Sequence, residues 1–301
     1  RWLALDRPRA ERFWPQADIV FCTAESYVPA GRARVVVTLH DAAYFEANAH
    51  RQDFAFRKQQ WKWTLLYRKL VRKADLFHTV SAFSAERLAH YFPEMAGRLR
   101  VVPNGVAPHF FTPGSAAGRA YLASIGLAER PFVLVPGGLH YRKNAELILA
   151  ACPELLRRCP GLVVAVSSHA GAEYRARARS LGPAVQLLGF VPDDALHALY
   201  SAAQVVWFPS RYEGFGMPVL EAMACGAPVV ASDASSIPEI AGGAAVLVPP
   251  ASPAAHVEAL CALLTDARAC GQLREAGRER AGLFSWADSA AQLKHCMDTL
   301  L

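Results

Sequence analysis

The sequence predicts an α/β protein of two domains, each built on a parallel β-sheet that helices cover on both faces. Short apolar runs, which suit buried strands, alternate along the chain with longer segments of helical periodicity. Such alternation is typical of parallel sheets, because the crossover between two parallel strands usually contains a helix. A chain of 301 residues is long enough for two domains of this kind.

The first half contains four predicted strands. They are the apolar runs at residues 18–22, 34–40, 75–80 and 99–102. Between them, the periodicity predicts a long helix over residues 53–73 and a shorter one over residues 81–91. Residues 108–118 are rich in Pro, Gly and Ser, which indicates a linker. We therefore assign residues 1–115 to the first domain.

The second half repeats the alternation in a more complete form. Its predicted strands are residues 132–135, 162–166, 185–188, 205–208, 228–231 and 244–248. Its predicted helices include residues 145–156, 195–203, 253–264 and 267–283. These elements place the second domain at residues 116–285. A last helix, residues 286–301, opens at Ser285 and Trp286.

Composition and charge narrow the class of protein. The apolar fraction of 53% and the charged fraction of 19% are those of an ordinary globular enzyme. Residues 1–115 contain 17 Lys and Arg against 10 Asp and Glu, whereas the remainder contains 15 against 16. A basic first half predicts an anionic partner for that domain. We find no motif for nucleic acid recognition, so we do not expect nucleic acid to be that partner.

The cysteines and the hydropathy pattern predict a cytoplasmic protein. Seven cysteines without a Cys-x-x-Cys spacing indicate reduced thiols rather than a disulfide or zinc framework. No apolar run reaches the roughly 18–20 residues needed to cross a bilayer, and we find no signal peptide. The chain starts with Arg rather than Met, so the sequence leaves open whether residues before Arg1 are missing.

The strongest functional signal lies in residues 210–226. Two glutamates, Glu213 and Glu221, stand on either side of seven residues. A predicted strand precedes them, so Glu213 falls in a strand-to-helix loop. Glu221 falls on the helix about one turn past Pro218, in what we expect to be the first turn.

The backbone N–H groups of the residues between the loop and the helix would then favour an anion such as a diphosphate. Those residues are Gly214, Phe215, Gly216 and Met217. Carboxylates at the two ends can accept hydrogen bonds from sugar hydroxyls, which predicts a nucleotide-sugar site.

This segment resembles the signature of the family-four retaining glycosyltransferases, which have the GT-B architecture of two facing Rossmann-like domains. Further segments resemble other motifs of the family and occur in the family's order: residues 38–41, 79–84, 101–106, 137–144, 188–191, 235–239 and 284–286. The resemblance covers roughly residues 18–290. It implies that the first half is the acceptor-side domain, although that half is short for the family. Two interpretations stay open: the sequence is a fragment, or the acceptor domain is reduced.

The resemblance also implies roles for the two glutamates and the base-binding loop. Glu213 would bind hydroxyls of the donor sugar, and Glu221 would accept both ribose hydroxyls with its two oxygens. Phe190 and Val191 would bind the nucleobase through backbone groups, so their side chains carry no base preference. The alternative for the glutamates is that both are acidic residues favourably placed near a helix N-terminus.

The predicted phosphate-binding loop follows the strand at residues 132–135. Gly137 and Gly138 form its turn, and Arg142 and Lys143 would bind the diphosphate and offset the charge on the leaving group. The alternative is a solvated pair of cations that caps the loop. Many family members have an arginine directly after the first glycine, where this chain has Gly138, so we expect Arg142 to supply that charge.

His40 ends an apolar strand at its carboxyl end, the usual ligand edge of a parallel sheet. The resemblance places it near the donor sugar, and the alternative is a buried histidine with satisfied hydrogen bonds. Asp41 would either orient His40 or cap the following segment, and the sequence leaves both open.

These assignments predict a retaining sugar transferase that needs neither a metal nor a cofactor. The chain has no Asp-x-Asp pair, and no carboxylate is placed to form a glycosyl–enzyme intermediate. Attack on the same face as the departing diphosphate is therefore favoured. The motifs resemble mannosyltransferases most, which implies GDP-mannose as the donor and a glycan or lipid-linked acceptor. The rival is an inactive nucleotide-sugar-binding fragment or subunit, and an epimerase or hydrolase on the same fold fits the motif set less well.

The predicted helix at residues 53–73 has two contrasting faces. Trp63, Leu66, Tyr67, Leu70 and Val71 share the arc that should face the core. The opposite arc carries cations with aromatic and aliphatic neighbours: Lys58, Lys62, Lys69, Arg72 and Lys73, with Phe54, Trp61 and Leu65. This arc predicts either a solvated face or a peripheral contact with an anionic membrane, on its inner, cytoplasmic side.

Overall fold

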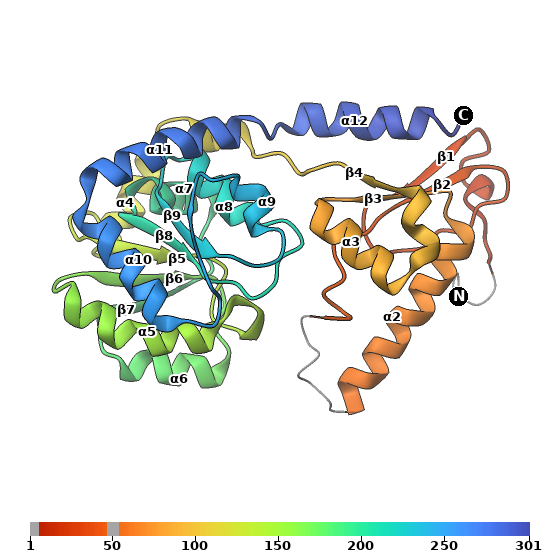
Figure 1. The fold of residues 1–301 in the computed structure, drawn as a ribbon. Helices are drawn as coiled ribbons and strands as arrows, with labels where there is room; N and C mark the ends of the chain where they lie inside the picture. The colour runs from red at the N-terminus through yellow and green to blue at the C-terminus, as the bar shows by residue number, and fades with distance from the viewer. Residues whose placement is uncertain (1–5, 47–53) are drawn as a thin grey trace. The chain divides into compact units, whose positions relative to one another are not determined.

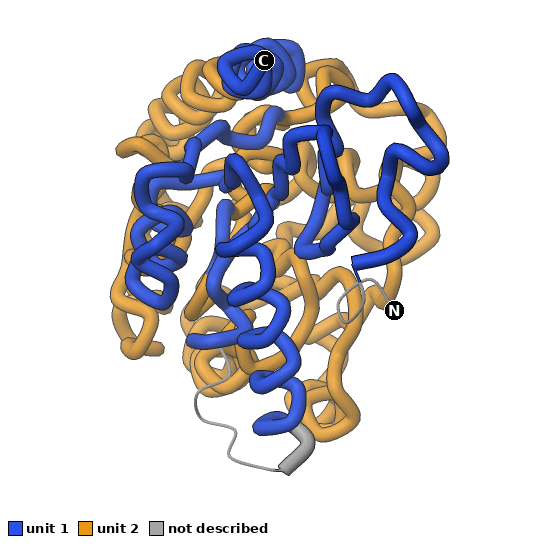
Figure 2. Tube along the Cα trace, turned by 90° about the vertical axis from the view of Figure 1, so that its right-hand side faces the viewer, with its two compact units in different colours: residues 1–105, 213–215, 286–301 blue, residues 106–212, 216–285 orange. Residues whose placement is uncertain are grey.

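The structure is a computed structural model, and it describes residues 6–46 and 54–301. The chain folds into two compact units, coloured separately in Figure 2. The first comprises residues 1–105, 213–215 and 286–301, and the second comprises residues 106–212 and 216–285. The short helix η3 (Pro108–Phe111) therefore belongs to the second unit, although the predicted first domain, residues 1–115, includes it.

Within the described residues, the first unit contains a four-stranded parallel sheet of order β1-β2-β3-β4. The strands are β1 (Ile19–Cys22), β2 (Arg34–Thr38), β3 (Leu76–Thr79) and β4 (Leu99–Val101). The helical segments are η1 (Ala10–Arg12), α2 (Phe54–Lys73), α3 (Ala82–Tyr91), η2 (Pro93–Arg98) and α12 (Trp286–Asp298), several of which are labelled in Figure 1. Each of the four strands predicted for this half is present.

The core of the first unit lies between its sheet and α2. Val37 of β2 and Phe77 of β3 are fully buried and pack with Tyr67 and Leu70 of α2. Trp63, Leu66 and Val71 are partly buried against the same core, which confirms the predicted buried arc of α2. Helix α12 is tied to the unit by Ser289, whose Oγ donates to the carbonyl oxygen of Pro103 at 2.6 Å.

The predicted outer arc of α2 is correct except at Lys69. Trp61 and Leu65 are 63% and 44% exposed, and Lys58, Lys62, Arg72 and Lys73 are exposed too. Lys69 is half-buried, because its Nζ pairs with Asp6 Oδ1 at 2.7 Å. The side chain of Phe54 lies outside the described residues. No helix among the residues that the structure describes is both long and apolar enough to cross a membrane.

Across residues 106–285, the strands form a six-stranded parallel sheet of order β10-β9-β8-β5-β6-β7. The strands are β5 (Phe132–Val135), β6 (Val163–Ser167), β7 (Val185–Gly189), β8 (Val205–Phe208), β9 (Val229–Ser232) and β10 (Val246–Val248). The strand order reverses between β5 and β8, as in a classical dinucleotide-binding fold. In sheets of this kind ligands bind beyond the carboxyl ends of the strands, near the reversal.

Helices cover this sheet in two layers (Figure 1). One layer is formed by α5 (Ala145–Arg158), α6 (Ala172–Ser180) and α10 (Pro253–Thr265). The other is formed by α4 (Ala116–Ser124), α7 (Asp193–Ala202), α8 (Met217–Ala224), α9 (Ile237–Ala241) and α11 (Ala267–Gly282). A short helix, η4 (Tyr141–Lys143), precedes α5. Strands β5, β6, β8 and β9 are buried along their whole length, because side chains on both faces pack against helices.

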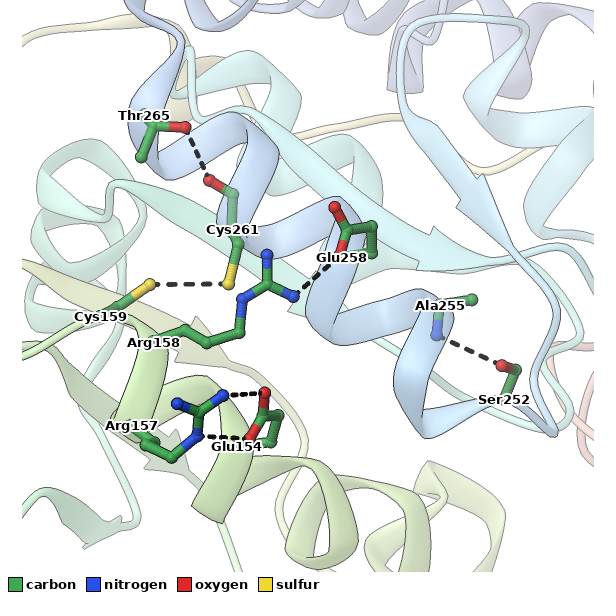
Figure 3. A network of polar contacts seen from close by, with 9 residues as sticks. All are labelled: Glu154, Arg157, Arg158, Cys159, Ser252, Ala255, Glu258, Cys261 and Thr265. Carbon is green, nitrogen blue, oxygen red and sulfur yellow. Dashed lines mark hydrogen bonds and ion pairs between the residues drawn. The ribbon is translucent and has the colours of Figure 1, made fainter.

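Figure 3 shows how α5 packs on α10. Arg158 Nη1 lies 2.7 Å from Glu258 Oε2, and Cys159 Sγ lies 3.6 Å from Cys261 Sγ. Deeper in the same core, the Trp207 indole N–H of β8 donates to His256 Nδ1 of α10 at 3.1 Å. The apolar contacts beneath these pairs hold the layer on the sheet, since a largely exposed ion pair adds at most about 1 kcal/mol.

Candidate functional site

A cavity of about 270 Å³ lies in the second unit beyond the carboxyl ends of its central strands. Its lining comes from the segments that follow β5, β6 and β7, and from α7 and α8. The lining residues are Pro136, Gly137, Ser167, Ser168, Phe190, Val191, Asp193, Leu196, Tyr200, Pro218 and Glu221. The place of the cavity is the one expected for a ligand of a doubly wound sheet.

The turn after β5 is shaped around Lys143. Gly137 has φ +90°, and a Cβ on it would lie 2.7 Å from Lys143 Cε and 3.2 Å from Nζ. Lys143 itself is only 7% exposed, and its Nζ lies 4.3 Å from the centroid of the Phe208 ring. A glycine at 137 thus lets a buried cation approach the backbone beside the cavity. This arrangement suits an anionic ligand.

The conformation of Gly138 explains why this chain lacks the arginine that many family members have directly after the first glycine. Gly138 has φ +80°, and a Cβ on it would lie 1.9 Å from the carbonyl oxygen of His169. No side chain can be accommodated there with this backbone, so an arginine at this position is excluded sterically. Arg142, the cation expected to replace that arginine, has its Nη1 3.5 Å from the carbonyl oxygen of Tyr212. This contact places the guanidinium beside the loop that leads to α8.

Glu221 lies on α8 with its carboxylate at the cavity. The predicted position in the first turn is wrong: α8 begins at Met217, so Glu221 is its fifth residue and no acidic residue occupies the first turn. The Tyr200 hydroxyl donates to Glu221 Oε2 at 2.9 Å. Burial raises the pKa of Glu221, and the hydrogen bond from Tyr200 acts in the opposite direction.

The N-terminus of α8 has the form that the sequence predicts. Gly216 precedes the helix with φ +107°, a conformation that favours glycine, and Pro218 lies in the first turn. Because Gly216 has no side chain, it cannot cap the N–H groups of that turn as Ser or Asp would. Met217 is half-buried at the start of the helix.

Another part of the cavity lining comes from the segment after β7. Phe190 is 88% exposed, whereas Val191 is buried. Asp193 and Leu196 follow on the first turns of α7. This part of the lining offers backbone groups, one carboxylate and an apolar surface, which suits a flat ring with hydrogen-bonding edges.

The first unit holds the remaining predicted residues. His40 lies just beyond the carboxyl end of β2 and is exposed, so the alternative of a buried histidine is wrong. Its backbone N–H donates to Glu25 Oε1 at 2.8 Å. Asp41 Oδ1 accepts from the Ala43 N–H at 2.7 Å, which supports the capping role for this side chain.

The loop residues Glu213, Gly214 and Phe215 belong to this first unit. The hydroxyls of Ser81 and Ser84 donate to the Gly214 carbonyl oxygen at 2.6 and 3.0 Å. A Cβ on Gly214 would lie 2.7 Å from Asp41 Cβ, so the close approach requires glycine. Glu213 is 6% exposed and Phe215 is buried.

Sequence reasoning missed two cavity residues of chemical interest, Tyr200 and Asp193. Both lie on α7, outside every motif used above, and only the folded structure shows that they stand near Glu221. The signal that could have drawn attention to Asp193 is the Asp193–Asp194 pair, since acidic residues are favourable in the first turn of a helix such as α7. In the part of the chain that the structure describes, no group of three or more His, Cys, Asp or Glu side chains could hold a metal ion.

Comparisons with known proteins assign the family. Residues 130–266 match the family model described as glycosyl transferases group 1, and residues 1–110 match the model described as glycosyltransferase family 4. The chain is 30% identical over 288 residues to O-antigen chain mannosyltransferase B of Escherichia coli, which covers 91% of this chain and 73% of that protein. The chain belongs to glycosyltransferase family 4.

Two further proteins are similar to this family-four chain. The MMP alpha-(1->4)-mannosyltransferase of Mycolicibacterium hassiacum is 33% identical over 231 residues, and the match covers 75% of this chain but 54% of that protein. The solved structure of sucrose-phosphate synthase from Thermosynechococcus elongatus is 25% identical with a TM-score of 0.78, covering 96% of this chain and 76% of that one. The predicted GT-B class with two parallel sheets is confirmed.

Proposed function

We propose that this chain is a retaining, metal-independent glycosyltransferase that moves mannose from GDP-mannose to a glycan or lipid-linked acceptor. The observation that carries the proposal is the cavity of the second unit. There, the half-buried carboxylate of Glu221 and a turn shaped around the buried Lys143 lie at one ligand edge of the sheet. In a nucleoside diphosphate, the ribose hydroxyls can donate hydrogen bonds to the carboxylate of Glu221, and the two phosphates can pair with the cation of Lys143.

A guanine base is supported by the chemistry of Asp193. Asp193 lines the cavity on the first turn of α7, shortly after the predicted base-binding residues Phe190 and Val191. An ionised carboxylate only accepts hydrogen bonds. Guanine offers two adjacent donors on one edge, its N1–H and its N2 amino group, whereas uracil offers the single N3–H. Asp193 therefore favours GDP over UDP.

Mannose as the transferred sugar is supported by the two relatives named above, both of which are called mannosyltransferases. The chain spans 54% of the second of these proteins, so the activity of the whole protein is part of the proposal.

The proposed reaction breaks the bond between sugar C1 and the diphosphate and forms a bond from C1 to an acceptor hydroxyl oxygen on the same face. The acceptor proton passes to the departing phosphate oxygen. Lys143 and Arg142 would offset the negative charge that grows on the diphosphate, together with the N-terminus of α8. Glu213 would hold sugar hydroxyls, and His40 would act near the sugar. These roles follow from the family resemblance.

A membrane-bound acceptor is supported by the exposed arc of α2. Trp61 and Leu65 are exposed beside Lys58 and Lys62, a combination that suits the interface of an anionic bilayer. We therefore include peripheral contact with the inner face of the membrane in the proposal.

A transfer assay tests this function. The purified chain is incubated with GDP-mannose, GDP-fucose, UDP-glucose or UDP-galactose and a lipid extract as acceptor source, with and without excess EDTA. We expect transfer from GDP-mannose, unchanged by EDTA, and an α-linked product. Transfer only from a UDP-sugar would contradict the donor, and loss with EDTA that Mn²⁺ restores would contradict metal independence. Tight nucleotide-sugar binding without transfer to any acceptor would favour the rival, an inactive binding subunit.

A further inference from the structure

Tyr200 is a fully buried tyrosine whose hydroxyl points at Glu221, the residue proposed to bind the ribose. It lies on α7 and donates to Glu221 Oε2 on α8 at 2.9 Å. Its ring packs edge-on against Phe110 of η3, with centroids 6.1 Å apart. The ring is therefore fixed by packing, and the hydroxyl offers one donor in one place.

Fixing the carboxylate matters for binding a ribose. A glutamate side chain has three rotatable bonds, and each ligand contact must otherwise offset the entropy of ordering them. With Oε2 engaged by Tyr200, Oε1 is the oxygen that a ligand in the cavity can use most directly. Both residues line that cavity.

The groups around Glu221 act on its ionisation in opposite directions, and the hydrogen bond from Tyr200 is one of them. From α7, Asp193 opposes its ionisation, whereas His109 of η3 and Lys143 of η4 favour it. Arg278 of α11, which also packs on α8, lies further along that helix beside Gly226. Burial is the largest influence and raises the pKa of Glu221, and Tyr200 is the strongest of the groups that lower it.

We propose that Tyr200 is a positioning residue for donor binding, which holds one oxygen of Glu221 so that the carboxylate meets the ribose hydroxyls. This inference rests on the proposed function, because it assigns a ribose to the cavity. Tyr200 itself touches no reacting atom.

The test compares GDP with 2′,3′-dideoxy-GDP, which lacks both ribose hydroxyls. Calorimetry gives the Kd of each nucleotide for the full chain, for Tyr200→Phe and for Tyr121→Phe. Tyr121 is a matched control, since it is a half-buried tyrosine on α4 of the same unit and does not line the cavity. We expect the wild-type chain to bind GDP about tenfold or more tightly than dideoxy-GDP, because charge-assisted hydrogen bonds are lost with the hydroxyls.

In Tyr200→Phe, we expect GDP binding to weaken by about five- to twentyfold while dideoxy-GDP binding stays within about twofold. The preference for the ribose hydroxyls is thereby lost, which a general loosening of the pocket would not produce. Tyr121→Phe should leave both Kd values unchanged. In a Glu221→Gln background, Tyr200→Phe should cause little further loss, because the residue through which Tyr200 acts is already altered.

Several outcomes would overturn the inference. Equal weakening of both nucleotides in Tyr200→Phe would show a structural role only, and unchanged binding of both would show no role. If Tyr200→Phe does not fold, the double variant with Glu221→Gln decides: recovery of folding supports the pairing, and failure to fold refutes it. A wild-type chain that binds neither nucleotide would overturn the proposed function and this inference together, whereas the other outcomes leave the proposed function standing.

Discussion

At the scale of single residues, Glu213 and Glu221 are assigned to different parts of one donor molecule. Glu221→Ala removes the proposed ribose contacts, which together are worth roughly 1.5–3 kcal/mol because a carboxylate accepts the bonds. We therefore expect GDP alone to bind about ten- to a hundredfold more weakly to this variant. Glu213→Ala should bind GDP as the wild-type chain does and lose turnover instead, because its partner is the sugar. Calorimetry with GDP and a transfer assay measure the two effects, and equal loss of GDP affinity in both variants would contradict the division.

Lys143 is the residue that we expect to stabilise the leaving diphosphate. Lys143→Ala should lower kcat by at least about 10²-fold, the usual effect of losing one group that stabilises transition-state charge. Since Lys143 also contacts the Phe208 ring, the Tm of the variant must be compared with that of the wild-type chain. Lys294→Ala is a suitable control, because Lys294 is exposed on α12 and pairs with Asp298 at 2.6 Å. A Lys143→Ala variant with full turnover and normal Tm would refute this role.

The sequence places these three residues in recognisable motifs, but it does not show all of their neighbours. Glu213, Glu221 and Lys143 stand in motifs whose spacing is visible along the chain. Tyr200 could not be found in this way, since its partner is on another helix and the contact depends on how α7 packs on α8. Lys69 was expected on an exposed arc, but helical periodicity cannot show that Asp6 lies within reach of it.

At the scale of elements, the turn after β5 is held by glycine conformations that a larger residue cannot adopt. Gly138→Ala adds a Cβ only 1.9 Å from the His169 carbonyl oxygen, on a backbone with φ +80°. We expect the variant to be destabilised by more than about 2 kcal/mol and to lose GDP binding. Gly182→Ala separates the cost of a positive φ from the cost of the contact with His169, because Gly182 has φ +88° but nothing within 4 Å of the added Cβ. It should cost only about 1 kcal/mol. Equal Tm values for the two variants would show that the contact with His169 is unimportant.

The exposed arc of α2 makes a prediction about membranes. Each cation near an anionic bilayer contributes about 1 kcal/mol, so Lys58→Glu with Lys62→Glu should weaken binding to anionic vesicles by ten- to a hundredfold or more. High salt should weaken the binding of the wild-type chain, because it screens the attraction. The control is Arg268→Glu with Arg274→Glu, which makes the same change of charge at exposed positions on α11. Flotation with anionic and neutral vesicles is the measurement, and a chain that binds neither, or both equally, has only a solvated helix face there.

Element boundaries were harder to predict than element types. Pro218 suggested a helix start that would place Glu221 in the first turn. The positive φ of Gly216 instead lets α8 begin at Met217, which moves the glutamate into the second turn. The carboxylate still reaches the cavity, because the cavity extends along α8 from Pro218 to Glu221. The place of the residue at the cavity was therefore predictable even though its turn was not.

At the scale of the whole molecule, the class of fold follows from the sequence because buried parallel strands need continuous apolar runs. The valine-rich runs at β2, β5 and β6 are buried from end to end apart from Arg34, and a run of that kind is visible without a structure. The grouping of residues along the chain is less visible. The segment 106–115 joins the second unit through packing of η3 on α8, a contact between residues about a hundred positions apart.

The organisation into two units predicts that the second unit binds the nucleotide by itself. Its six-stranded sheet and its apolar core are formed within residues 106–285, and every residue that lines the cavity lies in that range. A fragment of residues 106–285 should therefore fold and bind GDP with a Kd within about tenfold of that of the full chain. Circular dichroism checks folding and calorimetry measures the Kd, with Glu221→Ala in the same fragment as the control. A folded fragment that fails to bind GDP would show that the nucleotide requires groups from the first unit, and the assignment of ribose, base and diphosphate to the second unit would then be wrong.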